Sequence, residues 1–265
     1  FCRKHKMAYN QSQLNQLLSH FYRIIQMGLN NVKSEVIWEI IENSVNIFAY
    51  DLPGVAVLIP DFLREIEVLC GSQNTNLSAV KHNALLILNS LICYPNHFAG
   101  LDFPIVAQSK PYETKKPDTI LTSEDLKDKI SFIYMLVLNN ANEQPDIIVL
   151  AICGATVLLF EELHHANVRA AVVSKFVNLI LDCCDHVNDH VAQVAAECLT
   201  SLSLMYKIFE TQDKSLIVTI VTTLTNKIIK GIQQTTKRET VVANLLFCMK
   251  DWLLSNTIDL FLDRE

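Results

Sequence analysis

The chain has 265 residues, of which 50% are hydrophobic and 19% are charged, and its formal net charge is −6 at pH 7. This acidic balance excludes general binding to nucleic acid, which depends on a basic surface. The charged fraction is below the roughly 25% of an average domain. The sequence therefore indicates a long apolar seam, a large partner interface or both.

Apolar residues recur at every third or fourth position, which is the spacing of one face of an α-helix. Gly28 is expected to end or loosen the first helix, Ser34 to cap the second, and Pro60 to kink or restart the third. Pro95 is expected to stop the fourth. The helices predicted in this part of the chain cover about residues 14–25, 34–48, 53–70 and 77–93.

Residues 96–122 have a different composition, with three prolines and the pair Lys115–Lys116. We predict a long irregular surface loop at this place. It is the only candidate boundary in the chain, and the sequence is compatible both with one continuous array and with two domains. If the loop has a regulatory role, its candidate phosphorylation sites are Ser109, Thr114 and Thr119.

The helical pattern resumes after this loop. Ser123 caps a helix whose first turn is acidic, and Pro145 opens the next helix. Frequent β-branched residues between 217 and 225 weaken the helical pattern there. The helices predicted in this part cover about residues 123–138, 145–164, 168–184, 189–209, 214–231 and 237–254.

Many amphipathic helices joined by short turns are typical of stacked helical pairs. We therefore predict an all-α fold, a HEAT/armadillo-like helical solenoid (α-α superhelix), with residues 1–265 forming one helical-repeat segment. A compact helical bundle is the alternative architecture. Because the chain does not begin with methionine, we expect it to be part of a longer chain.

The sequence predicts no transmembrane segment, because spanning a bilayer takes about 20 apolar residues without charges. The most apolar run, Ile147–Phe160, ends at Glu161 and Glu162 and is predicted to be a buried core helix. The chain has eight cysteines, and most of them lie among apolar residues in helical patterns. Reduced thiols in a cytoplasmic protein are therefore expected rather than a disulfide framework.

The segment Cys183–His190 is the sharpest candidate for chemistry, because it holds two thiols, two imidazoles and two carboxylates. These are zinc donors, and His186 and His190 would share a helix face if the segment were helical. The metalloprotease pattern, however, needs glutamate where Val187 stands. We interpret the segment as the end of one helix followed by a polar turn.

A second polar cluster, residues 161–165, is interpreted as a helix C-terminus, where histidine favours the helix dipole. The basic positions Lys227, Lys230 and Lys237–Arg238 are interpreted as a solvated helix end and turn. Trp38 and Trp252 are interpreted as core residues, with an interface role as the alternative. With six glycines in the chain there is no phosphate-binding loop. We predict no catalytic residue, no metal site and no cofactor.

Several segments, taken in order, resemble a known family. They are residues 18–22 with Gly28–Leu29, Leu52–Gly54 with Asp61–Phe62, Asn89–Asn96, Glu161–Leu163 and Leu245–Trp252. Together they resemble the helical region of the alpha subunit of the Ral GTPase-activating protein complex, and more distantly that of tuberin. The resemblance covers about residues 11–254 and is weakest over 100–122.

The resemblance implies a non-catalytic scaffold that supports subunit association and the regulation of small GTPase signalling. In that family the GTPase-activating domain is a separate Rap/Ran-GAP-type fold later in the chain, so no catalytic residue is carried over. The implied partners are a beta-type subunit and, through the rest of the chain, a small GTPase of the Ral class. The alternatives are a free-standing helical adaptor for trafficking or transport, and a metal-dependent enzyme built on residues 183–190.

Overall fold

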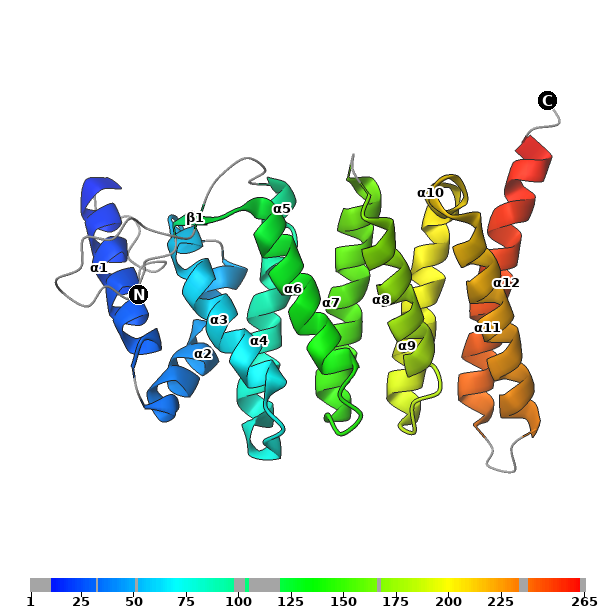
Figure 1. Ribbon diagram of the computed structural model, residues 1–265, viewed down its shortest axis with the longest axis horizontal. Coiled ribbons are helices and arrows are strands. Elements are labelled where there is room, and N and C mark those ends of the chain that lie inside the picture. Colours follow the sequence, from blue (N-terminus) through cyan, green and yellow to red (C-terminus); the bar gives the residue numbers. More distant parts are fainter. Residues whose placement is uncertain are drawn as a thin grey trace. The chain divides into compact units, whose positions relative to one another are not determined.

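The computed structural model describes residues 11–31, 33–50, 52–97, 103–104, 120–165, 168–233 and 238–262. The chain divides into two compact units, residues 1–133 and 134–265. The helix α6 (Ser123–Leu138) crosses this division. The predicted fold class, an all-α helical solenoid, is confirmed, because in each unit successive helices stack through their apolar faces (Figure 1).

The first unit contains the helices α1 (Gln11–Leu29), α2 (Ser34–Ala49), α3 (Ile59–Gly71) and α4 (Ser78–Leu91). Short 3-10 turns, η1 (Val55–Leu58) and η2 (Thr75–Leu77), precede α3 and α4. The helix α2 packs on α4, and α1 packs on α2 and η1. The Phe48 and Phe62 rings join α2 to α3 edge to face, with centroids 4.8 Å apart.

The structure tests two local predictions in this unit. The helix α1 continues one residue past Gly28 and ends at Leu29. A Cβ at position 28 would press on the Ile40 side chain of α2, so glycine also lets these two helices approach closely. The predicted restart at Pro60 is confirmed, because the 3-10 turn η1 precedes α3, which begins at Ile59.

The predicted loop over residues 96–122 lies mostly outside the described residues, and so do Ser109, Thr114 and Thr119. Pro95 does not simply stop a helix, since it lies inside the one-turn helix α5 (Tyr94–His97). Two short strands are described in this region. They are β1 (Phe103–Pro104) and β2 (Ile120–Leu121), which pair antiparallel.

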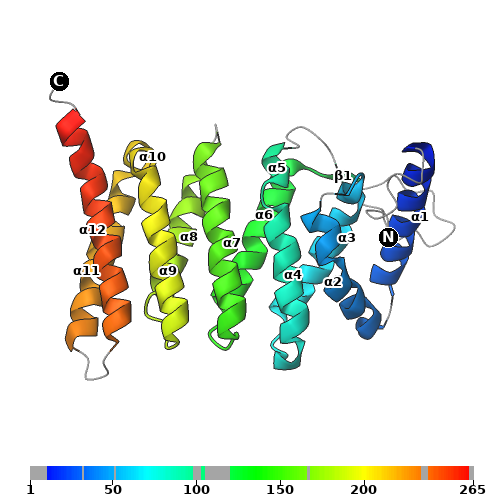
Figure 2. The ribbon, with the colours of Figure 1, turned by 180° about the vertical axis from the view of Figure 1, so that it is seen from behind.

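The second unit contains α7 (Pro145–His164), α8 (Ala170–Cys183), α9 (Asp189–Leu202), α10 (Tyr206–Gln212), α11 (Lys214–Gln233) and α12 (Glu239–Leu262). The predicted helix over 189–209 is broken by the 3-10 turn η3 (Ser203–Met205), which separates α9 from α10. Within this unit α7, α9 and α12 lie in one layer, and α8 and α11 lie in the other (Figure 2).

Two described helices, α7 and α11, are long and apolar enough to cross a membrane by length and composition alone. The most apolar run of α7 ends at Phe160, but the whole helix is 20 residues long, as predicted. In α7, 61% of the most apolar window is buried among other helices, as expected of a core helix. In α11 only 28% of the most apolar window is buried, so this helix exposes much of its apolar surface.

Candidate interaction surfaces

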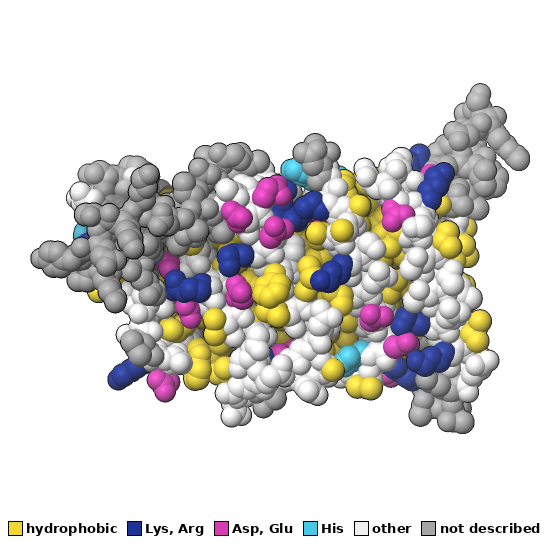
Figure 3. Space-filling view, in the orientation of Figure 1, with side chains coloured by type: hydrophobic (Ala, Val, Ile, Leu, Met, Phe, Trp, Pro, Cys, Tyr) yellow, Lys and Arg dark blue, Asp and Glu magenta, His cyan; other side chains and the backbone are white. Residues whose placement is uncertain are grey.

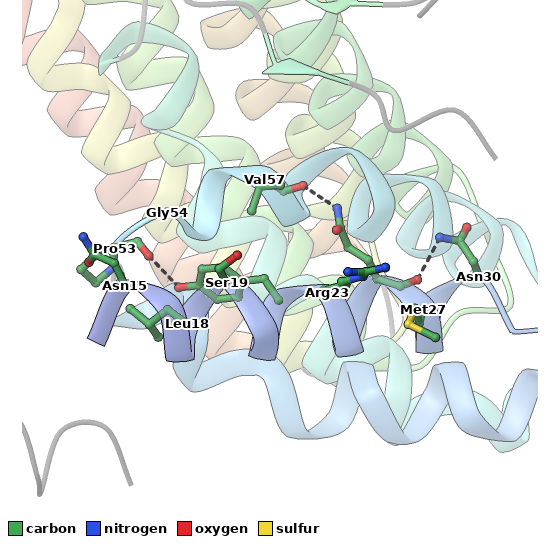
Figure 4. A pocket seen from close by; sticks show the side chains of 11 residues that line it. Asn15, Leu18, Ser19, Arg23, Met27, Asn30, Pro53, Gly54 and Val57 are labelled. Atoms are coloured by element: carbon green, nitrogen blue, oxygen red, sulfur yellow. Dashed lines mark hydrogen bonds between the residues drawn. The ribbon is translucent and has the colours of Figure 1, made fainter. Parts of the chain in front are cut away.

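A groove of about 1230 Å³ lies along α1 in the first unit (Figure 4). One wall comes from α1, and the other comes from the turn at Pro53–Gly54 and from Val57. Gly54 has a φ of 80°, a left-handed conformation that favours glycine and turns the chain back toward α1. The α1 wall of the groove is formed by Asn15, Leu18, Ser19, Tyr22, Arg23, Gln26, Met27 and Asn30.

Hydrogen bonds join the two walls of this groove. The Tyr22 hydroxyl donates to the Pro53 carbonyl at 2.9 Å, and Gln26 Nε2 donates to the Val57 carbonyl at 3.3 Å. Gln26 Nε2 also lies 3.2 Å from Asp61 Oδ2. These bonds hold the two walls of the groove together and place polar groups between them.

Asp61 is a buried carboxyl behind Gln26, a residue of the groove wall, and 4% of its surface is exposed. Burial raises the pKa of Asp61, and the charge of Arg64 and the Gln26 hydrogen bond offset part of this rise. Arg64 Nη1 lies 3.2 Å from Asp61 Oδ1, and Arg64 Nη2 donates to Asn30 Oδ1 at 3.0 Å. The cluster therefore connects α3 to the end of α1.

The raised pKa of Asp61 predicts a pH-dependent stability. Between the ordinary value of 3.8 and the raised value, the folded chain keeps a proton that the unfolded chain loses. The contribution of Asp61 to the free energy of unfolding is therefore lost as pH rises through this window. Urea unfolding from about pH 4 to about pH 7 should show a smaller decline in Asp61→Asn than in the native chain.

Asp213 supplies an opposite control for this measurement. Hydrogen bonds from Ser215 lower the pKa of Asp213, so its contribution is present above the ordinary value and is lost as pH falls. Because this loss falls below the ordinary value of 3.8, Asp213→Asn should leave the decline between about pH 4 and about pH 7 unchanged and alter the pH dependence only at lower pH. An Asp61→Asn profile parallel to that of the native chain would contradict the assignment.

The helix α1 carries a second apolar stripe besides its buried one. Leu17, Phe21 and Ile24 recur at helical spacing and are 36%, 40% and 67% exposed. The buried stripe of the same helix contains Leu14, Leu18, Tyr22, Ile25 and Leu29. A surface helix normally has one apolar stripe, so α1 has more apolar surface than its contacts in this unit use.

The outer face of α11 and α12 is the larger exposed apolar surface. The buried face of α12 contains Val241, Leu245, Cys248 and Trp252, and the side of α12 facing away from them is also apolar. Lys250 lies on this exposed side, 5.6 Å from the centroid of the Phe247 ring. We define the outer face by its exposed apolar residues, Val218, Ile229, Ile232, Leu246, Phe247, Leu253 and Leu254.

This outer face is hollowed between α10, α11 and α12 by a groove of about 350 Å³. Val218 and Leu253 line the groove, with the edges of Tyr206 and Trp252. Figure 3 shows hydrophobic side chains along the α11–α12 edge of the second unit. Glu210 and Lys214, an ion pair at 3.7 Å, also line the groove. An apolar centre with polar residues beside it is typical of a protein interface.

The cysteine and histidine side chains of residues 183–190, considered above as zinc donors, do not converge. Cys183 and Cys184 are buried at the end of α8, and burial raises the pKa of Cys183 to about 11. His186 Nδ1 accepts the Asn188 backbone N–H at 3.1 Å, and His190 is exposed. Among the described residues no group of three histidine, cysteine or acidic side chains could hold a metal ion.

This segment instead forms the turn between α8 and α9, and ion pairs connect this turn to α11. The Asn188 side chain caps α9 by accepting the N–H groups of His190 and Val191. Lys227 Nζ lies 2.8 Å from Asp185 Oδ2, with Lys230 at 3.4 Å from the same oxygen. Burial would raise the pKa of Asp185, but these two lysines lower it below its ordinary value.

The interpretation of the basic residues as solvated is therefore wrong for two of them. The Lys227 side chain is only 9% exposed. Arg238 donates to Asp189 Oδ1 at 2.6 Å and to the His186 carbonyl at 2.7 Å. Lys237 lies outside the described residues. Acidic and basic residues that are far apart in the sequence thus pair across the turns.

The second polar cluster is also more buried than expected. Only 2% of the Glu162 side chain is exposed, and both of its oxygens accept from Arg169 Nε, at 3.0 and 2.8 Å. The cluster therefore contains a buried ion pair that joins the end of α7 to the start of α8. His164, at the C-terminus of α7, is exposed and lies 2.8 Å from the Phe160 carbonyl.

The two tryptophans differ in their environment. Trp252 is 1% exposed, as predicted for a core residue, and its Nε1 donates to the Leu199 carbonyl at 2.9 Å. Trp38 is only partly buried, on α2. The apolar excess predicted a partner interface, but the spacing along one helix did not show which of its apolar stripes is exposed. Apolar residues on two sides of one helix, as in Leu245 and Phe247, were the available signal.

Comparison with known proteins shows what the whole chain is similar to. No family model matches the chain, and no solved structure matches it. Mouse Ral GTPase-activating protein subunit alpha-2 is 29% identical over 256 residues, which cover 91% of this chain and 13% of that protein. Human Ral GTPase-activating protein subunit alpha-1 is 25% identical over 273 residues, which cover 96% of this chain and 12% of that protein. The predicted resemblance is confirmed.

The similarity to these Ral GTPase-activating protein alpha subunits covers nearly the whole chain, but the chain spans only about an eighth of their length. The human Ral GTPase-activating protein subunit beta is 28% identical over 103 residues, covering 35% of this chain and 7% of that subunit. The similarity to tuberin stays a prediction. The similarity to these alpha subunits, and over a shorter range to the beta subunit, supports a role related to Ral GTPase-activating proteins.

Proposed function

We propose that this chain is a non-catalytic scaffold segment of a Ral-type GTPase-activating protein subunit, and that it supports subunit association. Similarity to two alpha subunits along nearly the whole chain supports the family role. The small share of those proteins that the chain spans supports a segment of a longer chain. The GTPase-activating reaction would then belong to another part of that chain.

The observation that carries the scaffold role is the outer face of α11 and α12. A helix that is apolar on all sides is normally buried, yet Phe247 is 61% exposed and Val218 is 64% exposed. Covering such residues removes apolar area from water at about 25 cal/mol per Å². We therefore assign this face as a docking surface for another protein.

The occupant that we propose is a beta-type subunit. Part of this chain is similar to the human beta subunit, so a related helical segment exists in that partner. Related helices that expose similar apolar stripes can pack face to face, as in self-complementary interfaces. Lys250 beside Phe247 would then favour an acidic residue on the partner.

The test uses the full-length subunit with the double substitution Val218→Asp and Phe247→Asp. Because both side chains are exposed, the fold should be unaffected, and circular dichroism should confirm this. Binding to the beta-type subunit should weaken roughly 10- to 100-fold, the loss expected for one or two central anchors. The matched control is Ile24→Asp on α1, whose side chain is 67% exposed, similar to Val218 and Phe247. This variant should bind normally.

Three outcomes would overturn this assignment. One is normal binding of the beta-type subunit by the double variant together with weakened binding by Ile24→Asp, which would place the interface on α1. Another is protection of Phe247→Cys from thiol labelling in the isolated full-length subunit, because the chain's own helices would then cover the face. The third is a native complex without activity toward a Ral-class GTPase, which would favour the free-standing adaptor.

A cytoplasmic location is part of this proposal. Cys183, Cys184 and Cys248 are buried free thiols, and reducing compartments keep thiols in this state. Fractionation of cells with an antibody to this segment would test the location.

The proposal also assigns the helical pairs to the HEAT or armadillo class of repeats.

A further inference from the structure

The groove along α1 differs in chemistry from the outer face of α11 and α12. Its α1 wall presents polar side chains at helical spacing, among them Asn15, Ser19 and Arg23 (Figure 4). The wall extends from Asn15 to Asn30, which is about 22 Å along a helix. This length matches about seven residues of an extended chain. At about 1230 Å³, the groove also exceeds the usual volume of a small-molecule pocket.

Two side chains of this wall, Ser19 and Arg23, lie one helical turn apart and are exposed. Within the described part of the chain, neither side chain forms a hydrogen bond or an ion pair. Tyr22 and Gln26 differ from them, because both donate hydrogen bonds to the opposite wall. The walls of the groove are therefore held in place, while a hydroxyl and a guanidinium between them are available to a ligand.

The groove carries a positive charge, although the chain as a whole is acidic. Arg23 is the only charged side chain among the described residues that line it. The helix α1 contains no aspartate or glutamate. Arg64 adds no free charge, because it pairs with Asp61 at 3.2 Å and with Glu65 at 2.8 Å. A single unpaired guanidinium suits one carboxylate, whereas phosphate groups on peptides are usually bound by clusters of arginines.

We propose that the groove along α1 binds an extended, acidic peptide segment of another protein. A carboxylate of the peptide pairs with Arg23, and the peptide backbone bonds to Ser19. An extended backbone suits this role because its N–H and C=O groups are free, whereas a helix has already paired them. This site lies in the first unit, and nothing in the inference depends on the docking surface proposed for the second unit.

The rest of the lining fits the side chains of such a peptide. Side chains alternate along an extended chain, so every second one would face the apolar part of the groove. Leu18, Met27 and Val57 belong to this part. Met27 is 67% exposed, and its flexible thioether can adapt to different apolar side chains. The groove therefore favours a peptide in which acidic and apolar residues occupy opposite sides.

The test uses the full chain and an array of seven-residue peptides with glutamate at the central position and apolar residues at alternating positions. A second array has glutamine in place of the glutamate, and a third has phosphoserine there. We expect the native chain to bind the glutamate peptides most tightly. The glutamine peptides should bind roughly 5-fold more weakly, which is the loss of one exposed charge pair.

Four variants separate the groove from the rest of the surface. Arg23→Glu replaces attraction by repulsion and should weaken binding of the glutamate peptides roughly 10-fold. Lys33→Glu makes the same charge change at an exposed position outside the lining and should bind normally. Ser19→Trp fills the groove and should abolish binding, whereas Gln16→Trp, an exposed position of α1 outside the lining, should not. Circular dichroism should show an unchanged fold in all four.

Several results would overturn the proposal. They are equal binding of the glutamate and glutamine peptides, no binding of any array peptide by the native chain, and equal losses in Arg23→Glu and Lys33→Glu. Normal binding by Ser19→Trp would place the peptide outside the groove and would overturn it as well. Tighter, Arg23-dependent binding of the phosphoserine peptides would overturn the choice of a carboxylate as the group that Arg23 holds.

Discussion

Replacing Trp252 with alanine is expected to lower the free energy of unfolding by about 4 kcal/mol, since large-to-small changes at fully buried aromatic positions cost this much. The indole ring lies edge to face with Phe209 at a centroid distance of 5.5 Å, and it is 6.3 Å from the Tyr206 ring. It thereby joins α12 to α10, and its hydrogen bond to Leu199 joins α12 to α9. Urea denaturation of the variant measures the loss.

Two further variants make the Trp252 result specific. Trp252→Phe keeps most ring packing and loses the hydrogen bond, so it should cost about 1–2 kcal/mol. Trp38→Ala removes the same side chain from a partly exposed site on α2 and should cost clearly less than Trp252→Ala. Equal losses at the two tryptophans would show that Trp252 does not hold the second unit together.

Replacing Glu162 with alanine is expected to lower the free energy of unfolding by about 3 kcal/mol, because it leaves the Arg169 guanidinium without its carboxylate in a largely buried site. Only 22% of the Arg169 side chain is exposed, so water cannot fully replace the partner. The loss should persist at high salt, since buried pairs are screened less than surface pairs. Chemical denaturation at low and high ionic strength measures both effects.

The double variant Glu162→Ala with Arg169→Ala is the decisive control for the ion pair. Once both charges are removed, part of the loss should be recovered, because the cost comes from an uncompensated charge rather than from the missing bond. Glu42→Ala, at an exposed helical position, should change stability by less than about 0.5 kcal/mol. Strict additivity of the two single losses would argue against the pair.

The sequence alone determined the positions of most helices. Residues 34–48 and 145–164 were predicted to be helical, and the structure has Ser34–Ala49 and Pro145–His164. Apolar spacing is a local property of the backbone, and first-turn prolines such as Pro145 mark where a helix begins. The predicted cap was one residue off, because Thr122 rather than Ser123 accepts the Asp125 backbone N–H at 3.1 Å. The order of short segments along the chain was also enough for the resemblance that the comparisons confirmed.

Tertiary structure alone decided which apolar stripes are covered and which charges meet. Both faces of α12 have the helical spacing, yet Leu245 is 2% exposed and Phe247 is 61% exposed. The ion pair of Lys227 with Asp185 joins residues 42 positions apart, and the hydrogen bond of Trp252 with Leu199 joins residues 53 positions apart. Periodicity describes one helix at a time, whereas burial and pairing depend on the neighbouring helix, which local spacing does not encode.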